Sequence, residues 1–508
     1  MTVNSLHQTR PTQPLSGHVD VLIVGAGISG LGLGHHLVTK QPGKTFAIVD
    51  SRDAIGGTWD LFRDPGIRSD SDLHTFGYEF KPWTSDNAIA DAHEILGYLH
   101  EVIDEDDLAR RIYLHHKVLT ADFSSETAQW TVTLERGGEQ FDVTCDILFS
   151  AAGYYDYAGG YTPHFEGQED FGGVIVHPQA WPEDLDYTGK KVVVIGSGAT
   201  AVTLIPAMAD TAGHITMLQR SPSYVMPLPR KDPIANGLRR VLPDKVAYRL
   251  TRRFNIGKQR LIYGISQRHP QLMRRILRAL NTRALPEGYA VDTHFNPKYD
   301  PWDQRMCAVP DADLFKAISK GKASVVTDRI VRFTKGGILL ESGQELEADI
   351  IVTATGLQLL AFGGMQLTVD GQSVDLHDCL AYKSMMLSGI PNFAFAIGYT
   401  NSSWTLKVDL VCDHLCRMLA YMDQHGYTTV VPVVDDPTMN KRPLLDFSAG
   451  YILRSIDQFP QQGSRGPWTV EMDYNVDHAR LRKGPVKDSA LRFSTAVRST
   501  TAPDMATA

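Results

Sequence analysis

The chain of 508 residues is long enough for two or three domains, each with its own core. Its hydrophobic content of 43% and charged content of 21% are those of an ordinary soluble globular protein. The net charge of −8 gives no electrostatic case for nucleic-acid binding, and no uninterrupted apolar run is long enough to span a membrane.

The 5 cysteines are widely spread and show no Cys-x-x-Cys metal spacing. Cys412 and Cys416 lie four residues apart on an expected helix, without His or Cys partners at ligand spacing, so they are predicted to lie in the core. We therefore expect reduced thiols in a cytoplasmic protein and no metal site. Residues 1–17 lack the apolar segment of a secretory signal and are expected to form a disordered leader.

A first dinucleotide motif follows this leader. Residues 19–24 (VDVLIV) predict a buried parallel strand, and residues 31–40 predict a helix. Between them stands the pattern Gly-x-Gly-x-x-Gly, formed by Gly25, Gly27 and Gly30, with Ser29 inside it. The glycines allow a tight turn and a close approach of the backbone to a pyrophosphate at the helix N-terminus. The next expected strand ends at Asp50, 20 residues after the last glycine, where a ribose hydroxyl needs a carboxylate acceptor.

A second motif, made of glycines, a tryptophan and an aspartate, comes next. Gly56-Gly57-Thr58-Trp59 is followed by Pro65-Gly66 and then by Asp70. Turn chemistry accounts for the glycines and the proline but not for the spacing of Trp59 and Asp70.

Residues 111–148 predict β-strands, and the tyrosine- and glycine-rich segment after Gly153 predicts a crossover linker. The linker carries the pattern Phe-x-Gly-x-x-x-His-x-x-x-Trp-Pro, formed by Phe171, Gly173, His177, Trp181 and Pro182. It stands between two glycine-rich turns, where two domains must communicate.

The second glycine-rich turn lies in residues 190–220. Its small positions are Gly196, Gly198 and Ala201, with Ser197, Ala199 and Thr200 between them. The strand that follows ends in Arg220-Ser221 instead of an acid. An arginine there suits the 2′-phosphate of NADP, which a carboxylate would repel, so NADPH is predicted rather than NADH.

Residues 230–290 are basic and helical in pattern. We expect a helical insertion whose apolar side covers the neighbouring domain, with peripheral contact to an anionic membrane as the alternative. Beyond it, residues 346–356 predict a strand ending in Ala354-Thr355-Gly356, at which the chain is expected to re-enter the first domain.

Taken together, these elements predict an α/β fold with two Rossmann-like domains, of which the first is discontinuous. With FAD assigned to the first domain by the resemblance described next, the expected segments are an FAD-binding part at 18–155, a linker at 156–189, an NADP-binding domain at 190–345, a second FAD-binding part at 346–492 and a disordered tail at 493–508.

The linker pattern resembles the signature of type I Baeyer–Villiger monooxygenases, and every position of it is met. The family pattern Gly-Gly-x-Trp, four residues, an aromatic residue, Pro-Gly, three residues and Asp is met except at Asp64, which stands where an aromatic residue is expected. Residues 20 to 492 also resemble the branch of ethionamide-activating monooxygenases, through runs such as GGTWDLFR, PGIRSDSD, IGSGATAVTL, PWDQR and MMLSGIPN.

This resemblance implies FAD and NADPH as cofactors, O₂ as co-substrate and ketones as substrates, which become esters through a flavin peroxide. The same oxidant would also oxygenate sulfides or thioamides. Arg305 is implied to stabilise the peroxide, Asp70 to orient Arg305, and His177 to couple NADP binding to domain position. The resemblance also assigns FAD contacts to Gly57, Thr58, Trp59, Leu61 and Val118, and an NADP contact to Arg68.

Two alternatives remain from the sequence. One is a flavin monooxygenase that acts mainly on sulfur or nitrogen, against which Trp181-Pro182 argues because such enzymes usually carry Phe or Tyr there. The other is a nucleotide-binding protein without catalysis, against which both glycine-rich turns, Arg305 and Asp70 argue. A disulfide reductase with the same two sites would need a redox-active cysteine pair, which the sequence lacks.

Overall fold

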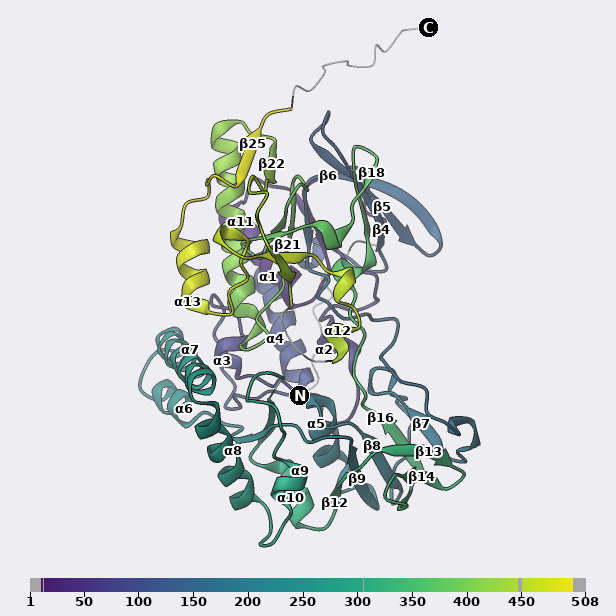
Figure 1. Cartoon of the computed structure of the whole chain (residues 1–508). Helices are drawn as coiled ribbons and strands as arrows, with labels where there is room; N and C mark the ends of the chain where they lie inside the picture. The colour runs from purple at the N-terminus through teal and green to yellow at the C-terminus, as the bar shows by residue number, and fades with distance from the viewer. Residues whose placement is uncertain (1–10, 12, 305, 446–449, 497–508) are drawn as a thin grey trace.

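The computed structural model describes residues 11, 13–304, 306–445 and 450–496. Its strands form two principal sheets, the first in the upper half of Figure 1 and the second in the lower half. The predicted residue Arg305, most of the predicted leader and residues 497–508 of the predicted tail lie outside the described residues.

The first sheet has a parallel centre of five strands. In spatial order these are β3 (Ile112–Tyr113), β2 (Phe46–Val49), β1 (His18–Val24), β6 (Glu139–Ser150) and β21 (Phe393–Phe395). Their apolar side chains are buried on both faces, as parallel sheets covered by helices require. The same β6 extends into an antiparallel arm with β5 (Gln129–Arg136) and β4 (Lys117–Ser124), to which β17 (Gln366–Val369) and β18 (Gln372–Ser373) are added.

Three long helices cover the parallel centre: α1 (Ile28–Lys40), α4 (Ala92–Glu105) and α11 (Trp404–His425). Helix α1 packs beside α11 although they are far apart in sequence, and Lys40 forms an ion pair with Asp413 across them. The remaining short elements of this half are α2 (Thr58–Leu61), α3 (Leu73–Phe76), β19 (Ala381–Tyr382), β20 (Met386–Leu387), β22 (Thr429–Pro432), β23 (Lys441–Pro443), α12 (Gly450–Leu453), β24 (Gln461–Gly463), α13 (Tyr474–Asp477) and β25 (Leu491–Ser494).

The second sheet is wholly parallel. Its order is β12 (Ala323–Thr327), β9 (His214–Gln219), β8 (Lys191–Ile195), β16 (Ile350–Thr353) and β7 (Val174–Val176). Helices α5 (Ala199–Met208) and α10 (Asp313–Ser319) pack on it, and β13 (Ile330–Thr334), β14 (Gly337–Leu340) and β15 (Glu345–Glu347) form a separate antiparallel unit. The first sheet takes strands from before residue 151 and after residue 365, so the predicted α/β fold with a discontinuous first domain is confirmed.

The strand pairing corrects two predicted segment edges. Strand β16 lies in the range expected for the second FAD-binding part, and β7 lies in the expected linker, yet both pair into the second sheet. The physical reason is that β8 is a buried central strand and needs a parallel neighbour on each side, which β9 and β16 supply. The chain therefore rejoins the first sheet only at β17.

Both predicted disordered ends are ordered in part. Leu15, expected in the leader, is buried, and its N–H donates to Nε2 of His116 at 3.3 Å. Phe493 and Ser494, expected in the tail, belong to β25, which pairs with β22. Phe493 also packs against Tyr427 with ring centroids 5.5 Å apart, so its apolar ring fixes the strand in place.

The predicted helical insertion leaves the second domain at β10 (Val225–Leu228) and returns at β11 (Cys307–Pro310), which pair in parallel. It contains α6 (Pro233–Arg239), α7 (Asp244–Arg268), α8 (Pro270–Ala284) and α9 (Val291–His294). One face of α7 contacts the first domain: Tyr248 donates its hydroxyl to the carbonyl of Tyr78 at 2.8 Å, and the buried Arg252 lies 3.3 Å from Asp409. Of the helices described, none combines the length and the apolar composition needed to cross a bilayer.

Candidate active site

A cavity of about 930 Å³ lies where the two domains meet. Residues from both predicted glycine-rich turns line it, together with most of the loop between α2 and α3. Among the predicted site residues, its walls include Gly25, Gly27, Ser29, Asp50, Gly57, Thr58, Trp59, Arg68, Asp70, Val118, Ala199 and Thr200.

The turn between β1 and α1 is shaped to receive an anion. Gly25 has φ +114, and a Cβ there would lie 2.6 Å from the carbonyl oxygen of Ala151. A Cβ on Gly30 would lie 1.9 Å from the oxygen of Gly25, so only glycine lets α1 start this close to the strand. Helix α1 begins after Gly27 without a side-chain cap, which leaves its first N–H groups for a ligand phosphate. These residues fit the diphosphate of FAD.

Asp50 ends β2 at the cavity wall. Its carboxylate accepts the N–H of Ala26 at 2.8 Å and the N–H of Arg52 at 3.0 Å. Burial raises the pKa of this carboxyl, and the two backbone hydrogen bonds oppose that rise. A carboxylate oxygen can accept two hydrogen bonds, so each oxygen of Asp50 can still accept one from a ribose hydroxyl.

The turn from Gly56 to Leu61 lies against the first turn. The Cα of Gly57 would be 3.7 Å from a Cβ on Gly27, and Gly57 itself has φ +57. Thr58 shares a hydrogen bond of 3.3 Å with the hydroxyl of Tyr157, and Trp59 packs edge-on against Phe76. Leu61 ends α2 and does not line the cavity.

Asp70 lines the cavity, as predicted. Its predicted partner Arg305 lies outside the described residues, so their pairing stays a prediction. Arg68, which was expected to contact NADP, crosses to the second domain and pairs with Asp313 at the start of α10, with 2.5 Å between Nη1 and Oδ2. The other η nitrogen of Arg68 is buried and has no hydrogen-bond partner among the described residues.

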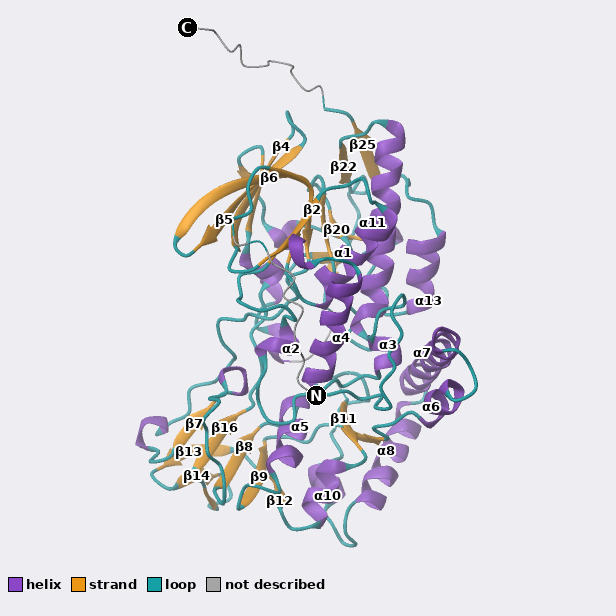
Figure 2. Ribbon diagram, turned by 180° about the vertical axis from the view of Figure 1, so that it is seen from behind, coloured by secondary structure: helices purple, strands orange, loops and turns teal. Residues whose placement is uncertain are grey.

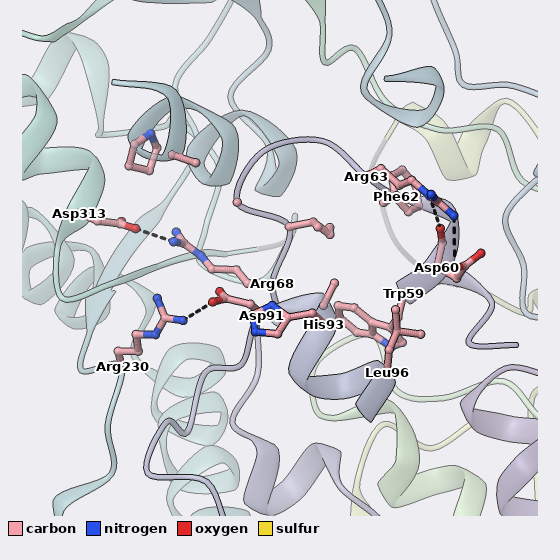
Figure 3. Close-up of a pocket in the computed structure, with 15 residues that line it drawn as sticks. Trp59, Asp60, Phe62, Arg63, Arg68, Asp91, His93, Leu96, Arg230 and Asp313 are labelled. Carbon is pink, nitrogen blue, oxygen red and sulfur yellow. Dashed lines mark hydrogen bonds and ion pairs between the residues drawn. The ribbon is translucent and has the colours of Figure 1, made fainter. Parts of the chain in front are cut away.

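A neighbouring cleft of about 730 Å³ shares Trp59, Phe62 and Arg68 with this cavity. Figure 3 shows that Arg68 and Arg230 enter it side by side, each held by a carboxylate. Arg230 pairs with Asp91 at 2.6 Å. Like the pair of Arg68 with Asp313, this ion pair joins the first domain to the second. The two ion pairs thus tie the domains together beside the cavity.

The turn between β8 and α5 repeats the geometry of the first turn. Gly196 has φ +134, and a Cβ there would lie 2.3 Å from the oxygen of Ala354. Helix α5 begins after Gly198 without a side-chain cap, and the fully buried Ala201 lets it pack closely on the sheet. Ser197 shares a hydrogen bond of 2.8 Å with Ser223, next to the segment that carries Ser221.

Arg220 directly follows β9 and is exposed. No carboxylate pairs with it in the part of the chain that the structure describes. Its guanidinium therefore keeps all its donors for a phosphate, as a 2′-phosphate site at this position requires.

The linker residues hold the edge of the second sheet. Phe171 packs on Phe333, and a Cβ on Gly173 would lie 2.2 Å from the oxygen of Asp349. Trp181, which precedes Pro182, packs on Tyr187 with ring centroids 6.5 Å apart. These contacts are packing contacts within the second domain, and none of the five signature residues lines the cavity.

His177 uses both ring nitrogens. Nδ1 accepts the N–H of Gln179 at 3.1 Å, which leaves the ring proton on Nε2, and Nε2 donates to the carbonyl of Gly356 at 3.1 Å. Burial lowers the pKa of His177, so the neutral ring is favoured. Both ring nitrogens are thus engaged with backbone groups, and the linking role of His177 stays a prediction.

Asp64 lines the cavity with a buried carboxyl that is 2% exposed. Neither of its carboxyl oxygens has a hydrogen-bond partner among the described residues. Burial raises the pKa of Asp64 to about 7. Where the family pattern has an aromatic residue, the cavity wall thus contains a buried carboxyl group whose oxygens lack hydrogen-bond partners among the described residues.

Aromatic residues from the far parts of the chain complete the wall. Trp404 donates its indole N–H to the hydroxyl of Ser29 at 2.9 Å, and Tyr154 packs against it. Sequence reasoning missed Tyr154, Tyr157 and Phe362 as wall residues. The cluster of tyrosines just after β6 was the signal that could have indicated Tyr154 and Tyr157.

The comparisons with known proteins agree with this geometry. The model of the flavin-binding monooxygenase-like family matches residues 82–388, which is more than half of the chain. The chain belongs to this family. A model of an NAD(P)-binding Rossmann-like domain matches residues 23–86.

Among curated relatives, the FAD-containing monooxygenase EthA of Mycobacterium tuberculosis is 52% identical over 94% of this chain and 98% of its own length. The probable FAD-binding monooxygenase AlmA of Acinetobacter baylyi is 47% identical over 94% of this chain and 96% of its own. The predicted membership among these flavoprotein monooxygenases is thereby confirmed.

Solved structures share the fold. An oxidized steroid monooxygenase bound to NADP superimposes with a TM-score of 0.73 at 23% identity, covering 94% of this chain and 100% of that one. An open form of cyclohexanone monooxygenase gives 0.68 at 21% identity, covering 82% of this chain and 90% of that one. At this identity the likeness concerns the fold alone.

Proposed function

We propose that the protein is an FAD-containing, NADPH-consuming monooxygenase of the Baeyer–Villiger type. It inserts one atom of O₂ into ketones to give esters, and it also oxygenates sulfides or thioamides. The observation that carries the proposal is that two uncapped, glycine-tight helix N-termini, those of α1 and α5, serve one cavity at a domain boundary.

The residues of the first domain fit FAD. The α1 turn holds the diphosphate, Asp50 accepts from the ribose, and the strand at Val118 contributes to the wall on the adenine side. The second turn with Arg220 and Ser221 fits NADPH. Bound flavin, once reduced by NADPH, supplies the electrons that split O₂ between substrate and water.

The protein's own contribution is to orient the reactants and to limit water. Trp59, Phe76 and Trp404 give the cavity an apolar wall, which strengthens any charge interaction inside it. Asp70 provides the carboxylate that would orient a guanidinium at the reacting atoms, the role proposed for Arg305. Linear and aryl-alkyl ketones are the proposed substrate class.

The test is incubation of the purified protein with FAD, NADPH, ¹⁸O-labelled O₂ and a linear methyl ketone, followed by mass spectrometry of the product. We expect an ester that carries one ¹⁸O atom. A parallel reaction with a thioether separates the two activities: a sulfoxide without any ester would replace the Baeyer–Villiger assignment by sulfur oxygenation. Absence of NADPH oxidation with either substrate would refute a catalytic role.

A further inference from the structure

The helical insertion has a charge unlike the rest of the chain. Residues 234–285 contain thirteen basic residues and one acidic residue, Asp244, a formal charge of +12. The whole chain has −8, so the remainder has −20. The basic residues are Arg239, Arg240, Lys245, Arg249, Arg252, Arg253, Lys258, Arg260, Arg268, Arg274, Arg275, Arg278 and Arg283.

The same segment holds most of the large apolar side chains that are strongly exposed. Nine of thirteen such residues among those described lie between 234 and 280, and the other four are scattered over the chain. Seven of the nine lie on α7 and α8: Val246, Leu250, Phe254, Leu261, Leu272, Ile276 and Leu280. Contiguous exposure of this kind on a surface indicates an interaction site.

The spacing places these side chains in one stripe on each helix. On α7 the intervals are four, four and seven residues, and on α8 they are four and four. The stripe of α7 lies opposite its buried face, which contains Tyr248, Thr251 and Asn255. Figures 1 and 2 show α7 and α8 together on one flank of the molecule, with no other element covering them from outside.

We propose that α7 and α8 form a docking surface for an anionic lipid membrane. The apolar stripes enter the boundary between headgroups and acyl chains, and exposed basic side chains such as Arg249 and Arg253 contact lipid phosphates. A nucleic acid would satisfy the charges but leaves rows of Leu and Phe without a partner. Symmetric pairing of two copies would bring two surfaces of +12 together, which charge repulsion opposes.

The docking surface lies one helix away from the cavity. The inner face of α7 holds the segment around Phe76, a cavity wall residue, because Arg252 donates to the carbonyls of Thr75 at 3.1 Å and Gly77 at 2.7 Å. Gln259 of α7 accepts the hydroxyl of Ser402, another wall residue, at 2.8 Å. A membrane on the outer face would therefore offer lipophilic substrates close to the site, although docking itself does not depend on the proposed reaction.

The experiment is co-sedimentation of the full protein with vesicles of phosphatidylcholine alone or mixed equally with phosphatidylglycerol. We expect binding to the anionic vesicles at low salt, and binding at least about tenfold weaker to neutral vesicles or at high salt. The double variants Leu250→Ser/Phe254→Ser and Arg249→Glu/Arg253→Glu should each lower the affinity at least about tenfold. Val331→Ser and Lys320→Glu/Lys322→Glu remove matched exposed groups outside the insertion and should leave it unchanged.

Absence of binding to anionic vesicles at low salt would overturn the proposal. So would equal binding by the wild type and both double variants, or a wild-type oligomer that Leu250→Ser/Phe254→Ser converts to monomer without any vesicle binding. Equal affinity for a single-stranded oligonucleotide, lost in Arg249→Glu/Arg253→Glu but kept in the Ser variant, would replace the membrane by nucleic acid. Unchanged circular dichroism of the variants verifies their fold in each case.

Discussion

Replacing Asp64 by Asn should remove a loss of stability that grows with pH. The carboxyl is 2% exposed, has no partner for either oxygen among the described residues, and burial raises its pKa to about 7. In the unfolded chain an Asp ionises near its ordinary pKa of about 4. Between these values the native protein keeps a proton that the unfolded chain has released, so stability falls as the pH rises.

The size of this effect follows from the width of that interval. Each pH unit contributes about 1.4 kcal/mol, so the full penalty is about 4 kcal/mol, complete above pH 7 and absent below pH 4. Between pH 5 and pH 8 it changes by about 3 kcal/mol. Asn has nearly the same size and keeps a buried polar group, so Asp64→Asn isolates the ionisation.

The assay is equilibrium urea unfolding of the wild type and Asp64→Asn at pH 5, 6, 7 and 8. We expect the variant to gain stability relative to the wild type by about 3 kcal/mol across this range, because the ionisation penalty disappears. The infrared difference spectrum between the wild type and Asp64→Asn at pH 6 should show the carbonyl band of one protonated carboxyl. Asp53→Asn removes an exposed carboxylate from the same part of the chain and serves as the control. A difference that does not vary with pH would refute the reasoning, since Asp64 would then be ionised and paired in solution.

Three further predictions concern the second domain and its contact with the first. Gly66→Ala should raise KM for NADPH severalfold, because its Cβ would lie 2.6 Å from the Cβ of Ala207 on α5. Gly343→Ala is the control: Gly343 has a φ of +85, close to the +80 of Gly66, but its Cβ would have no atom within 4 Å, so KM should not change. Arg220→Ala should raise KM for NADPH about 10- to 100-fold through the loss of one charged hydrogen bond, and it should not change KM for NADH. Arg329→Ala removes another exposed arginine and should change neither value. Equal effects on both coenzymes would contradict a 2′-phosphate site. His177→Asn should slow flavin reduction in stopped-flow experiments but leave the pH dependence of that rate unchanged between pH 7 and 9. The reason is that burial lowers the pKa of His177 and keeps its ring neutral in this range. A change in this pH dependence would instead assign proton transfer to His177.

The sequence predicted the parts of this site that depend on neighbouring residues. Each glycine-rich turn lies within one strand-turn-helix unit, and Asp50 ends the next strand, so spacing alone located them. The sheet that receives β16 could not be predicted in this way. A buried run of three apolar residues and Thr353 suits any parallel strand, and only the pairing with β8 and β7, far away in sequence, assigns it to the second sheet.

Asp64 shows a second limit of local reasoning. The sequence reveals that an aromatic residue is missing there, but the burial of the carboxyl and the absence of partners arise from segments that fold around it. The wall residue Phe362 was hidden for the same reason, since its side chain reaches the cavity only through tertiary packing. Spacing predicts backbone turns well because turns are local, and it predicts cavity walls poorly because walls are not.

The loop from Phe62 to Asp70 is where the two domains are coupled. Gly66 packs on α5, Arg68 pairs with Asp313 of α10, and Asp64 faces the cavity from the same loop. Arg68 is buried while Asp313 is partly exposed, so withdrawing Asp313 would leave a buried guanidinium without its carboxylate. This ion pair therefore opposes movement of the second domain away from the loop unless another acceptor replaces Asp313. Arg68 lines the cavity, and its other η nitrogen is buried without a hydrogen-bond partner among the described residues, so Arg68 has a spare donor for an anionic ligand once this nitrogen is uncovered. Exchange of acceptors at this guanidinium would link coenzyme binding to the position of the second domain.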